Sequence, residues 1–395
     1  MTNRNRWPRW IAAALVALAL LVAVAWRQQS DALRFGSGRA TWTTEAWTAT
    51  PKSRIDAATI GTTRSNPASV GGRKDKDDDA ACYSDYRQNL RDYRAQLGPA
   101  RSADEVIDRL LLDFVATDPS EWMSGELGDE YRAASDRWSS DVDLAWLALD
   151  FCNVDCERDA YIRHLLSVDS DNAAAWMVAM DAARQQKDQH GFDSALREAF
   201  QAKIYDPRIG VVFLHLRRQL AHVPRPDSCQ GQQWKSEMQR DLGRAPADAD
   251  LLDGMAGAVE MAIALPSFSG LFGCKDTAWP LTEKRRKRCI ALLSRVAAGD
   301  TLIEQMLANV LLIKLQPDAE KLAQLRERYR QLRWLMSIAQ QKPFPGNYFA
   351  RMYADGEVAM LQAIAMERGQ WPPPPDWLPD DPRGRALILG EDPPD

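Results

Sequence analysis

The chain has 395 residues, a formal net charge of −5 and a sequence pI near 5.6. This length is enough for two domains of ordinary size or for one extended helical array with a continuous core. The acidic balance argues against a dedicated nucleic-acid-binding protein, because such proteins gather Lys and Arg on one face. We therefore expect no nucleic-acid partner.

The first 26 residues have the pattern of an export signal or a membrane anchor. Residues 1–9 are rich in Arg, and residues 10–26 then contain no charged side chain. The apolar run lies between the length of a secretory signal and that of a spanning helix, which needs roughly 17 to 25 residues. Trp residues at both ends of the run and the positive-inside rule favour a transmembrane anchor behind a cytoplasmic basic tail, residues 1–9. The alternative is a signal peptide cleaved near Ala25, because Ala23 to Ala25 has the small-x-small form of a cleavage site.

Residues 27–80 are rich in Thr, Ser, Gly and Asp and carry few large aliphatic side chains. Such a segment cannot bury enough apolar surface to fold, so we expect a disordered tether between the anchor and the body. From the compact signal and the usage of Ala and Arg we expect a bacterial inner-membrane protein, single-pass, with its body in the periplasm. Cleavage at the alternative site would instead release a periplasmic or secreted protein.

Residues 81–370 are predicted to form an all-α domain. Ala, Leu and Arg are abundant and β-branched residues are few, which favours helices. Apolar residues recur at helical spacing, as at Ile107, Leu110 and Leu111, and period-2 alternation is absent. Ser102, followed three residues later by Glu105, has the form of a capping box. The predicted helices cover residues 83–97, 104–116, 127–137, 141–152, 157–167, 172–187, 192–205, 209–221, 231–242, 249–264, 281–297, 301–314, 318–340 and 346–368.

Two segments interrupt or follow these helices. The loop 266–279 is the longest apolar-rich break inside the body, and it either lines a groove or covers the core. Residues 371–395 form a Pro-rich C-terminal tail, which must leave the helix because Pro lacks the backbone donor. We expect Trp371 and Trp377 to pack this tail across the last helical hairpin. Docking of the tail into a partner's aromatic groove is the alternative.

Residues 171–207 contain two predicted helices joined by a short turn around His190. Ala195, Ala202 and Pro207 match the second-helix spacing of the tetratricopeptide repeat, and Trp176 stands near that family's first-helix Trp. The segment therefore resembles a tetratricopeptide-type helical hairpin, with a weaker echo before it from residue 157. It departs from the family in being three residues longer between Trp176 and Pro207 and in lacking the usual Gly and Tyr of the first helix. The resemblance implies a stacked α-solenoid that binds a protein or peptide; a generic hairpin in an irregular bundle remains the alternative.

The six cysteines all lie beyond the predicted tether. An even number of cysteines in an exported chain indicates disulfide bonds, and short loops favour pairing between near neighbours. The candidate pairs are Cys152 with Cys156, Cys274 with Cys289, and Cys82 with Cys229.

A metal site built from Cys152, Cys156 and His164 is the alternative for the first pair. It lacks a fourth ligand and the paired spacing of zinc sites, so we expect no metal. The phosphate-binding, dinucleotide-binding, nucleophile-elbow and zinc-protease motifs are absent, and we expect no cofactor. His215 lies in an apolar run, where a satisfied core histidine is a better interpretation than a catalytic base.

Charged groups elsewhere have structural interpretations. The pairs Asp141 with Asp143 and Asp248 with Asp250 stand at predicted helix starts, where carboxylates cap free N–H groups. The basic run 284–288 is interpreted as a solvated helix face, with anionic lipid or an acidic partner as the alternative.

The sequence therefore predicts no catalytic, cofactor or metal residue. We expect a membrane-anchored periplasmic protein that acts as a protein-interaction or scaffold module, with an unknown protein partner. Its contact surface would include the helix face around Trp176 and Met180. The alternative is an exported enzyme with an unfamiliar active site, built on the loop 266–279.

Overall fold

The computed structural model describes residues 74–117, 125–152, 157–226, 233–263, 268–275 and 279–392. The chain divides into two compact units, Met1–Ala81 and Cys82–Asp395, and the second unit carries the features analysed below. The predicted basic tail, apolar run and most of the tether, residues 1–73, lie outside the described residues. Within the described ranges, no helix combines the length and the apolar character that crossing a membrane requires.

The body is all-α, as predicted, and no strand occurs among the residues that the structure describes. Helix boundaries mostly lie within a few residues of the predicted ones, because the caps act locally. The elements are α2 (Lys74–Gln96), α3 (Ala103–Ala116), α4 (Gly125–Arg137), α5 (Val142–Asp150), α6 (Arg158–Val168), α7 (Ala173–Gln185), α8 (Gln189–Gln201), α9 (Val211–Leu220), α10 (Gln233–Leu242), α11 (Asp248–Ile263), the 3₁₀ turn η2 (Ser269–Lys275), α12 (Glu283–Val296), α13 (Leu302–Leu315), α14 (Ala319–Ala339), α15 (Tyr348–Asp355), α16 (Glu357–Glu367) and α17 (Pro382–Leu389).

Two of the predicted cap residues, Ser102 and Asp141, stand at the first turns of α3 and α5. Ser102 caps α3 by accepting a hydrogen bond from the backbone N–H of Glu105 at 3.2 Å. The Glu105 carboxylate bonds the backbone N–H of Arg101, one residue before the position that a reciprocal capping box uses. Asp141 caps α5 through the backbone N–H of Leu144 at 2.9 Å. Local signals therefore define where these helices begin.

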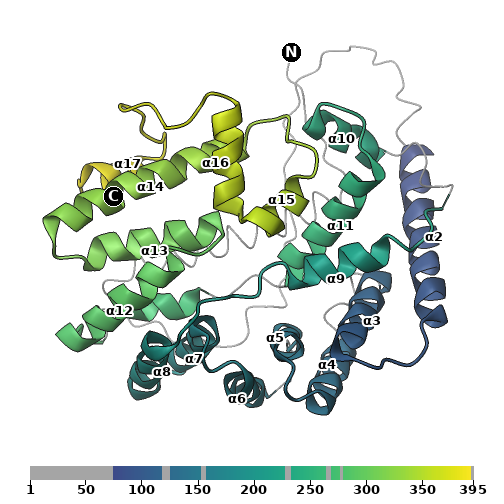
Figure 1. The fold of residues 1–395 in the computed structure, drawn as a ribbon, viewed down its shortest axis with the longest axis horizontal. Helices are drawn as coiled ribbons and strands as arrows, with labels where there is room; N and C mark the ends of the chain where they lie inside the picture. The colour runs from purple at the N-terminus through teal and green to yellow at the C-terminus, as the bar shows by residue number, and fades with distance from the viewer. Residues whose placement is uncertain are drawn as a thin grey trace, which may run out of the picture. The chain divides into compact units, whose positions relative to one another are not determined.

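Consecutive helices pack against one another from α3 to α8, as in a helical-repeat array (Figure 1). The path of contacts then continues from α8 to α12, and through α13 and α14 to α16. From α16 it returns through α15, α11 and α9 to α3. The helix contacts of the body thus form a closed circuit, in contrast to an open solenoid, in which each repeat touches only its neighbours.

The predicted hairpin at residues 171–207 is formed by α7 and α8, which pack closely along each other. Its base is closed by Asn172, whose side-chain oxygen accepts the backbone N–H of Asp206 at 3.0 Å. The Asn172 amide nitrogen in turn donates to the Asp206 carbonyl at 2.7 Å. Ala195 and Ala202 are buried, so the small residues of the predicted second helix do lie in a packed interface.

The segment between α8 and α9 connects distant parts of the body. The Tyr205 hydroxyl donates to the Glu304 carboxylate at 2.6 Å, and Glu304 is fully buried. Glu304 also forms a complete capping box with Thr301 at the start of α13. Tyr205 packs against two of the three hydrophobic clusters of the core. This segment thereby joins the α3–α8 array to the C-terminal helices.

Four predictions about elements need correction. The helix predicted over 346–368 is two helices, because Gly356 adopts φ +83° and breaks it into α15 and α16. The tether was predicted to end at residue 80, but α2 begins at Lys74. The Pro-rich tail was predicted without a helix, but it contains α17, which packs against α14 and has Asp381 as its N-cap. The basic run is not wholly solvated, because Arg285 is buried.

Arg285 is buried because it joins two helices. Its guanidinium bonds both carboxylate oxygens of Asp193 in α8 at 2.7 Å and donates to the Pro280 carbonyl at 2.9 Å. The planar group also lies near the rings of Phe192 and Trp279. A bidentate pair of this kind is well suited to a partly buried interface.

The disulfide candidates are partly described. Cys274 in η2 and Cys289 in α12 form a disulfide bond with an S–S distance of 2.05 Å, which is one of the pairs that the sequence predicts. Cys82 and Cys152 are each disulfide-bonded as well. Their predicted partners, Cys229 and Cys156, lie outside the described residues, so these two pairings stay predictions. A disulfide at Cys152 removes a thiolate that the alternative metal site would need.

Candidate functional site

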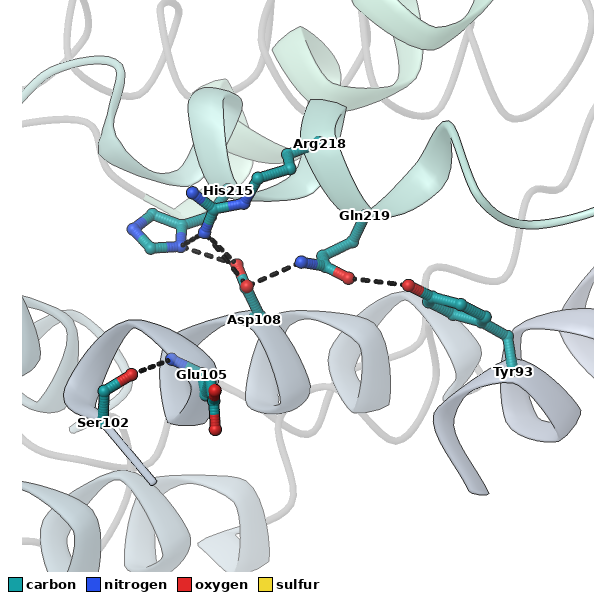
Figure 2. A network of polar contacts seen from close by, with 7 residues as sticks. All are labelled: Tyr93, Ser102, Glu105, Asp108, His215, Arg218 and Gln219. Atoms are coloured by element: carbon teal, nitrogen blue, oxygen red, sulfur yellow. Dashed lines mark hydrogen bonds and ion pairs between the residues drawn. The ribbon is translucent and has the colours of Figure 1, made fainter. Parts of the chain in front are cut away.

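The candidate site is a network of polar side chains where α2, α3 and α9 meet (Figure 2). Its centre is Asp108, which is buried on α3 at the face that packs against α9. One Asp108 oxygen lies 2.7 Å from His215 Nδ1 and 2.8 Å from an Arg218 nitrogen. The other accepts a hydrogen bond from the Gln219 amide at 2.6 Å. A buried carboxylate held by so many donors stays where the fold places it.

The hydrogen bonds determine the role of His215. A carboxylate only accepts hydrogen bonds, so Nδ1 of His215 carries a proton and donates a hydrogen bond to Asp108. The Arg218 nitrogen lies 3.0 Å from the same Nδ1, and it donates to the carboxylate instead. His215 is therefore the satisfied core histidine that the sequence predicts, with Asp108 as the partner that the sequence did not reveal.

The network extends to α2 through Gln219. Its side-chain oxygen accepts a hydrogen bond from the Tyr93 hydroxyl at 3.0 Å, as Figure 2 shows. Burial, and secondarily the Asp108 charge, raises the pKa of Tyr93. Tyr93 therefore remains a neutral donor near neutral pH, and the network ties three helices together.

An open pocket of about 220 Å³ lies beside this network. Typical sites for drug-sized ligands have about 300 to 1,000 Å³, so this pocket has room for a smaller molecule. It is lined by residues 97–99 and 101 of the loop between α2 and α3, by Glu105, Asp108 and Arg109 of α3, and by Gln219 of α9.

A second buried carboxylate holds the start of α9. Gly210 is the N-cap of this helix, at φ +100°, and provides no side-chain cap. Glu260 of α11 takes its place, accepting the backbone N–H groups of Gly210 at 2.7 Å and Phe213 at 2.8 Å. Burial raises the pKa of Glu260 to about 7, and these backbone hydrogen bonds oppose the rise. Burial, with the nearby Glu260, raises the pKa of Asp150 to about 8.

The structure places the other sequence candidates in the core or at caps. Met180 is fully buried and Trp176 is half-buried, so the helix face predicted as a contact surface is mostly interior. The described part of the loop 266–279 is η2, which packs onto α7 and covers the core. Asp250 bonds Arg244 in a bidentate pair and accepts the Ala247 N–H, which agrees with a capping role. Among the described residues, no group of acidic, His or Cys side chains is arranged to hold a metal ion.

Sequence reasoning missed Asp108 and Glu260. Asp108 lies between the apolar residues Ile107 and Leu110, and a charged residue on the buried face of a helix signals a buried partner. The partner itself is 107 residues away in the chain, so no local pattern points to it. Glu260 likewise stands on the buried face of an apolar helix and caps a helix other than its own.

Comparison with known proteins gives no relationship: no protein family, curated protein or solved structure matches the chain.

Proposed function

We propose that the chain is a membrane-anchored periplasmic protein whose helical body acts as a protein-interaction scaffold. The observation that carries this proposal is the sequential packing of helices from α3 to α8, which is the arrangement that repeat proteins use to present an extended binding surface. The α7–α8 hairpin, with its buried Ala195 and Ala202, supports a tetratricopeptide-like origin for this array. The anchor, residues 10–26, and the tether, residues 27–73, are parts of the proposal.

The disulfide chemistry supports the proposed compartment. Cys274 and Cys289 are both buried and bonded, and such bonds persist in oxidising compartments such as the periplasm. The location is tested by expressing the full chain with a C-terminal tag and treating spheroplasts with protease. We expect the tag to be digested while the membrane is intact. Protection of the tag until the membrane is lysed would contradict the proposed orientation.

The scaffold proposal is tested by photo-crosslinking in cells. A photoreactive residue is placed singly at exposed positions on three helices of the array, Arg132 on α4, Arg163 on α6 and Arg197 on α8. The exposed Lys284 on α12 and Lys321 on α14, which lie outside the array, are the controls. We expect at least one position on the array to give a discrete adduct with one protein, which also forms at high salt, and the controls to give none. The absence of a protein adduct at all three positions on the array would contradict the scaffold.

The alternative, an exported enzyme, is favoured by one observation: Asp108, which is hydrogen-bonded to His215, lines an open pocket. An enzyme using this pair would turn over a chromogenic ester, and His215→Gln would abolish that turnover while leaving the fold intact. Equal rates for the wild type and the variant, after subtraction of the spontaneous rate, would exclude catalysis by this pair.

A further inference from the structure

Two guanidinium groups at the pocket beside Asp108 have no hydrogen-bond or ion-pair partner among the residues that the structure describes. Arg101 and Arg109 both line it, and within the described ranges the guanidinium of neither makes a hydrogen bond or an ion pair. Asp113 lies near enough to Arg109 to interact with it electrostatically, but its ion pair is with Arg94, at 2.9 Å. Arg101 precedes the N-terminus of α3, where the helix dipole also favours a negative charge.

The two carboxylates of the pocket have other hydrogen-bond partners. Asp108 accepts from His215, Arg218 and Gln219. Glu105 bonds the backbone N–H of Arg101 at 2.7 Å. Within the described residues, neither carboxylate forms an ion pair with Arg101 or Arg109.

The charges around the pocket leave a small positive excess. Three guanidinium groups, from Arg101, Arg109 and Arg218, stand against the carboxylates of Glu105 and Asp108, which leaves one positive charge. The loop side of the pocket adds apolar surface from Leu97 and Pro99. A short apolar molecule with one negative group would match both features.

We propose that this pocket binds a small organic anion, with its carboxylate or phosphate group held by Arg101 and Arg109 and its apolar part against Leu97 and Pro99. Asp108 and Gln219 of the network line the pocket and are hydrogen-bonded to each other, so little conformational entropy is lost there on binding. The proposal does not depend on a protein partner, and it stands or falls independently of the scaffold function.

The binding experiment uses the full chain in detergent and isothermal titration calorimetry at low salt. The probes are butyrate, butyl phosphate and inorganic phosphate, with the neutral butyramide as a control. We expect one of the two organic anions to bind with a stoichiometry of one and the amide not to bind. Tighter binding of butyrate or of butyl phosphate identifies the preferred anionic group. If inorganic phosphate binds and neither organic anion does, the proposed role of Leu97 and Pro99 is contradicted.

Variants assign the binding to the pocket. The double variant Arg101→Gln with Arg109→Gln should weaken binding at least about tenfold, because each charge-assisted hydrogen bond contributes more than a neutral one. Lys284→Gln with Lys287→Gln removes the same charge from the exposed side of α12 and should leave affinity unchanged.

A steric variant tests the pocket without changing its charge. A Cβ at Gly98 would meet no atom within 4 Å, so Gly98→Phe can fill the pocket without a clash in the backbone. We expect Gly98→Phe to abolish binding, while its thermal unfolding midpoint stays close to the midpoint of Gly98→Ala. The proposal would be overturned if the charge variant and Gly98→Phe both bound the probe with unchanged affinity. It would also be overturned if no probe bound at a concentration of roughly 10 mM.

Discussion

At the scale of single residues, this protein places carboxylates in its interior where they hold helices together. Asp108 joins α3 to α9, Glu260 caps α9 from α11, and Glu304 caps α13 while receiving the Tyr205 hydroxyl. Burying a charge is costly unless hydrogen bonds compensate it, and each of these carboxylates has at least two donors. Their replacement therefore has consequences that can be measured.

Asp108→Asn should lower the free energy of unfolding by about 2 kcal/mol, because the amide turns a donor toward the donors of Arg218 and Gln219. The cost stays moderate because Arg218 is half exposed and its charge remains solvated. Urea denaturation followed by circular dichroism measures the change. Glu283→Gln is the control, since Glu283 forms an exposed pair with Arg286 that contributes little. A difference of less than about 0.5 kcal/mol between the two variants would contradict the proposed clamp.

Glu260 predicts a pH dependence of stability. Its pKa is about 7 in the folded protein and near 4.5 when unfolded, so folding takes up a proton between these values. The resulting stability is full below about pH 4.5 and is lost as the pH rises through about 7. Asp150 acts in the same direction up to about pH 8, and the neighbouring Tyr353 stays neutral because burial and Glu260 raise its pKa.

The test compares the wild type with Glu260→Gln in urea at pH 5 and pH 8. The wild type should lose more stability across this range than the variant, by on the order of 3 kcal/mol, because glutamine does not titrate. Glu260 also contributes to the raised pKa of Asp150, so the difference between the two proteins reports Glu260 together with its effect on Asp150. Equal losses of unfolding free energy in the two proteins between pH 5 and pH 8 would show that Glu260 does not cause the pH dependence of stability.

At the scale of elements, η2 shows how a loop without regular helix becomes part of the core. Gly270 lets η2 approach α7 so closely that a Cβ would lie 2.6 Å from the Met177 carbonyl oxygen. Leu271 is fully buried beside it. The disulfide from Cys274 to Cys289 then attaches η2 to α12. The turn is held by one close backbone contact on one side and by a covalent bond on the other.

Gly270→Ala should destabilise the protein by about 1 to 3 kcal/mol, since the Met177 carbonyl belongs to a helix backbone and cannot move aside without cost. Gly98→Ala is the matched control, because a Cβ there meets nothing within 4 Å. Thermal unfolding of both variants tests the difference. Equal midpoints would mean that η2 does not pack onto α7 as closely as described.

Removing the disulfide with Cys274→Ser and Cys289→Ser should cost about 3 kcal/mol in the chain-entropy account, because the bond closes a loop of some 15 residues. The loss should appear in urea denaturation as a lower midpoint. The rest of the body should remain folded, since Arg285 still joins α12 to α8. A variant as stable as the wild type would show that the bond contributes nothing beyond the packing of η2.

At the scale of the whole body, the closed circuit of helix contacts predicts cooperative unfolding. Tyr205 and Ala179 pack against both of the two largest hydrophobic clusters, so neither cluster can be lost alone. Leu111→Ala in the first cluster and Leu293→Ala in the second should each cost about 2 to 5 kcal/mol and shift the same transition. Tryptophan fluorescence and far-UV circular dichroism should give coincident curves. Two separate transitions in Leu293→Ala would indicate an open array whose parts unfold independently.

The sequence by itself determined the fold class, most helix boundaries, the cap residues Ser102 and Asp141, and the Cys274–Cys289 pair. These features depend on side chains within one or two turns, or within a short loop, so local patterns suffice to predict them. Only the tertiary structure decided that α9 returns to α3, that Arg285 is buried against Asp193, and that Asp108 meets His215. These contacts join residues about a hundred positions apart, and helical periodicity identifies which face of a helix is buried but not which helix will cover it.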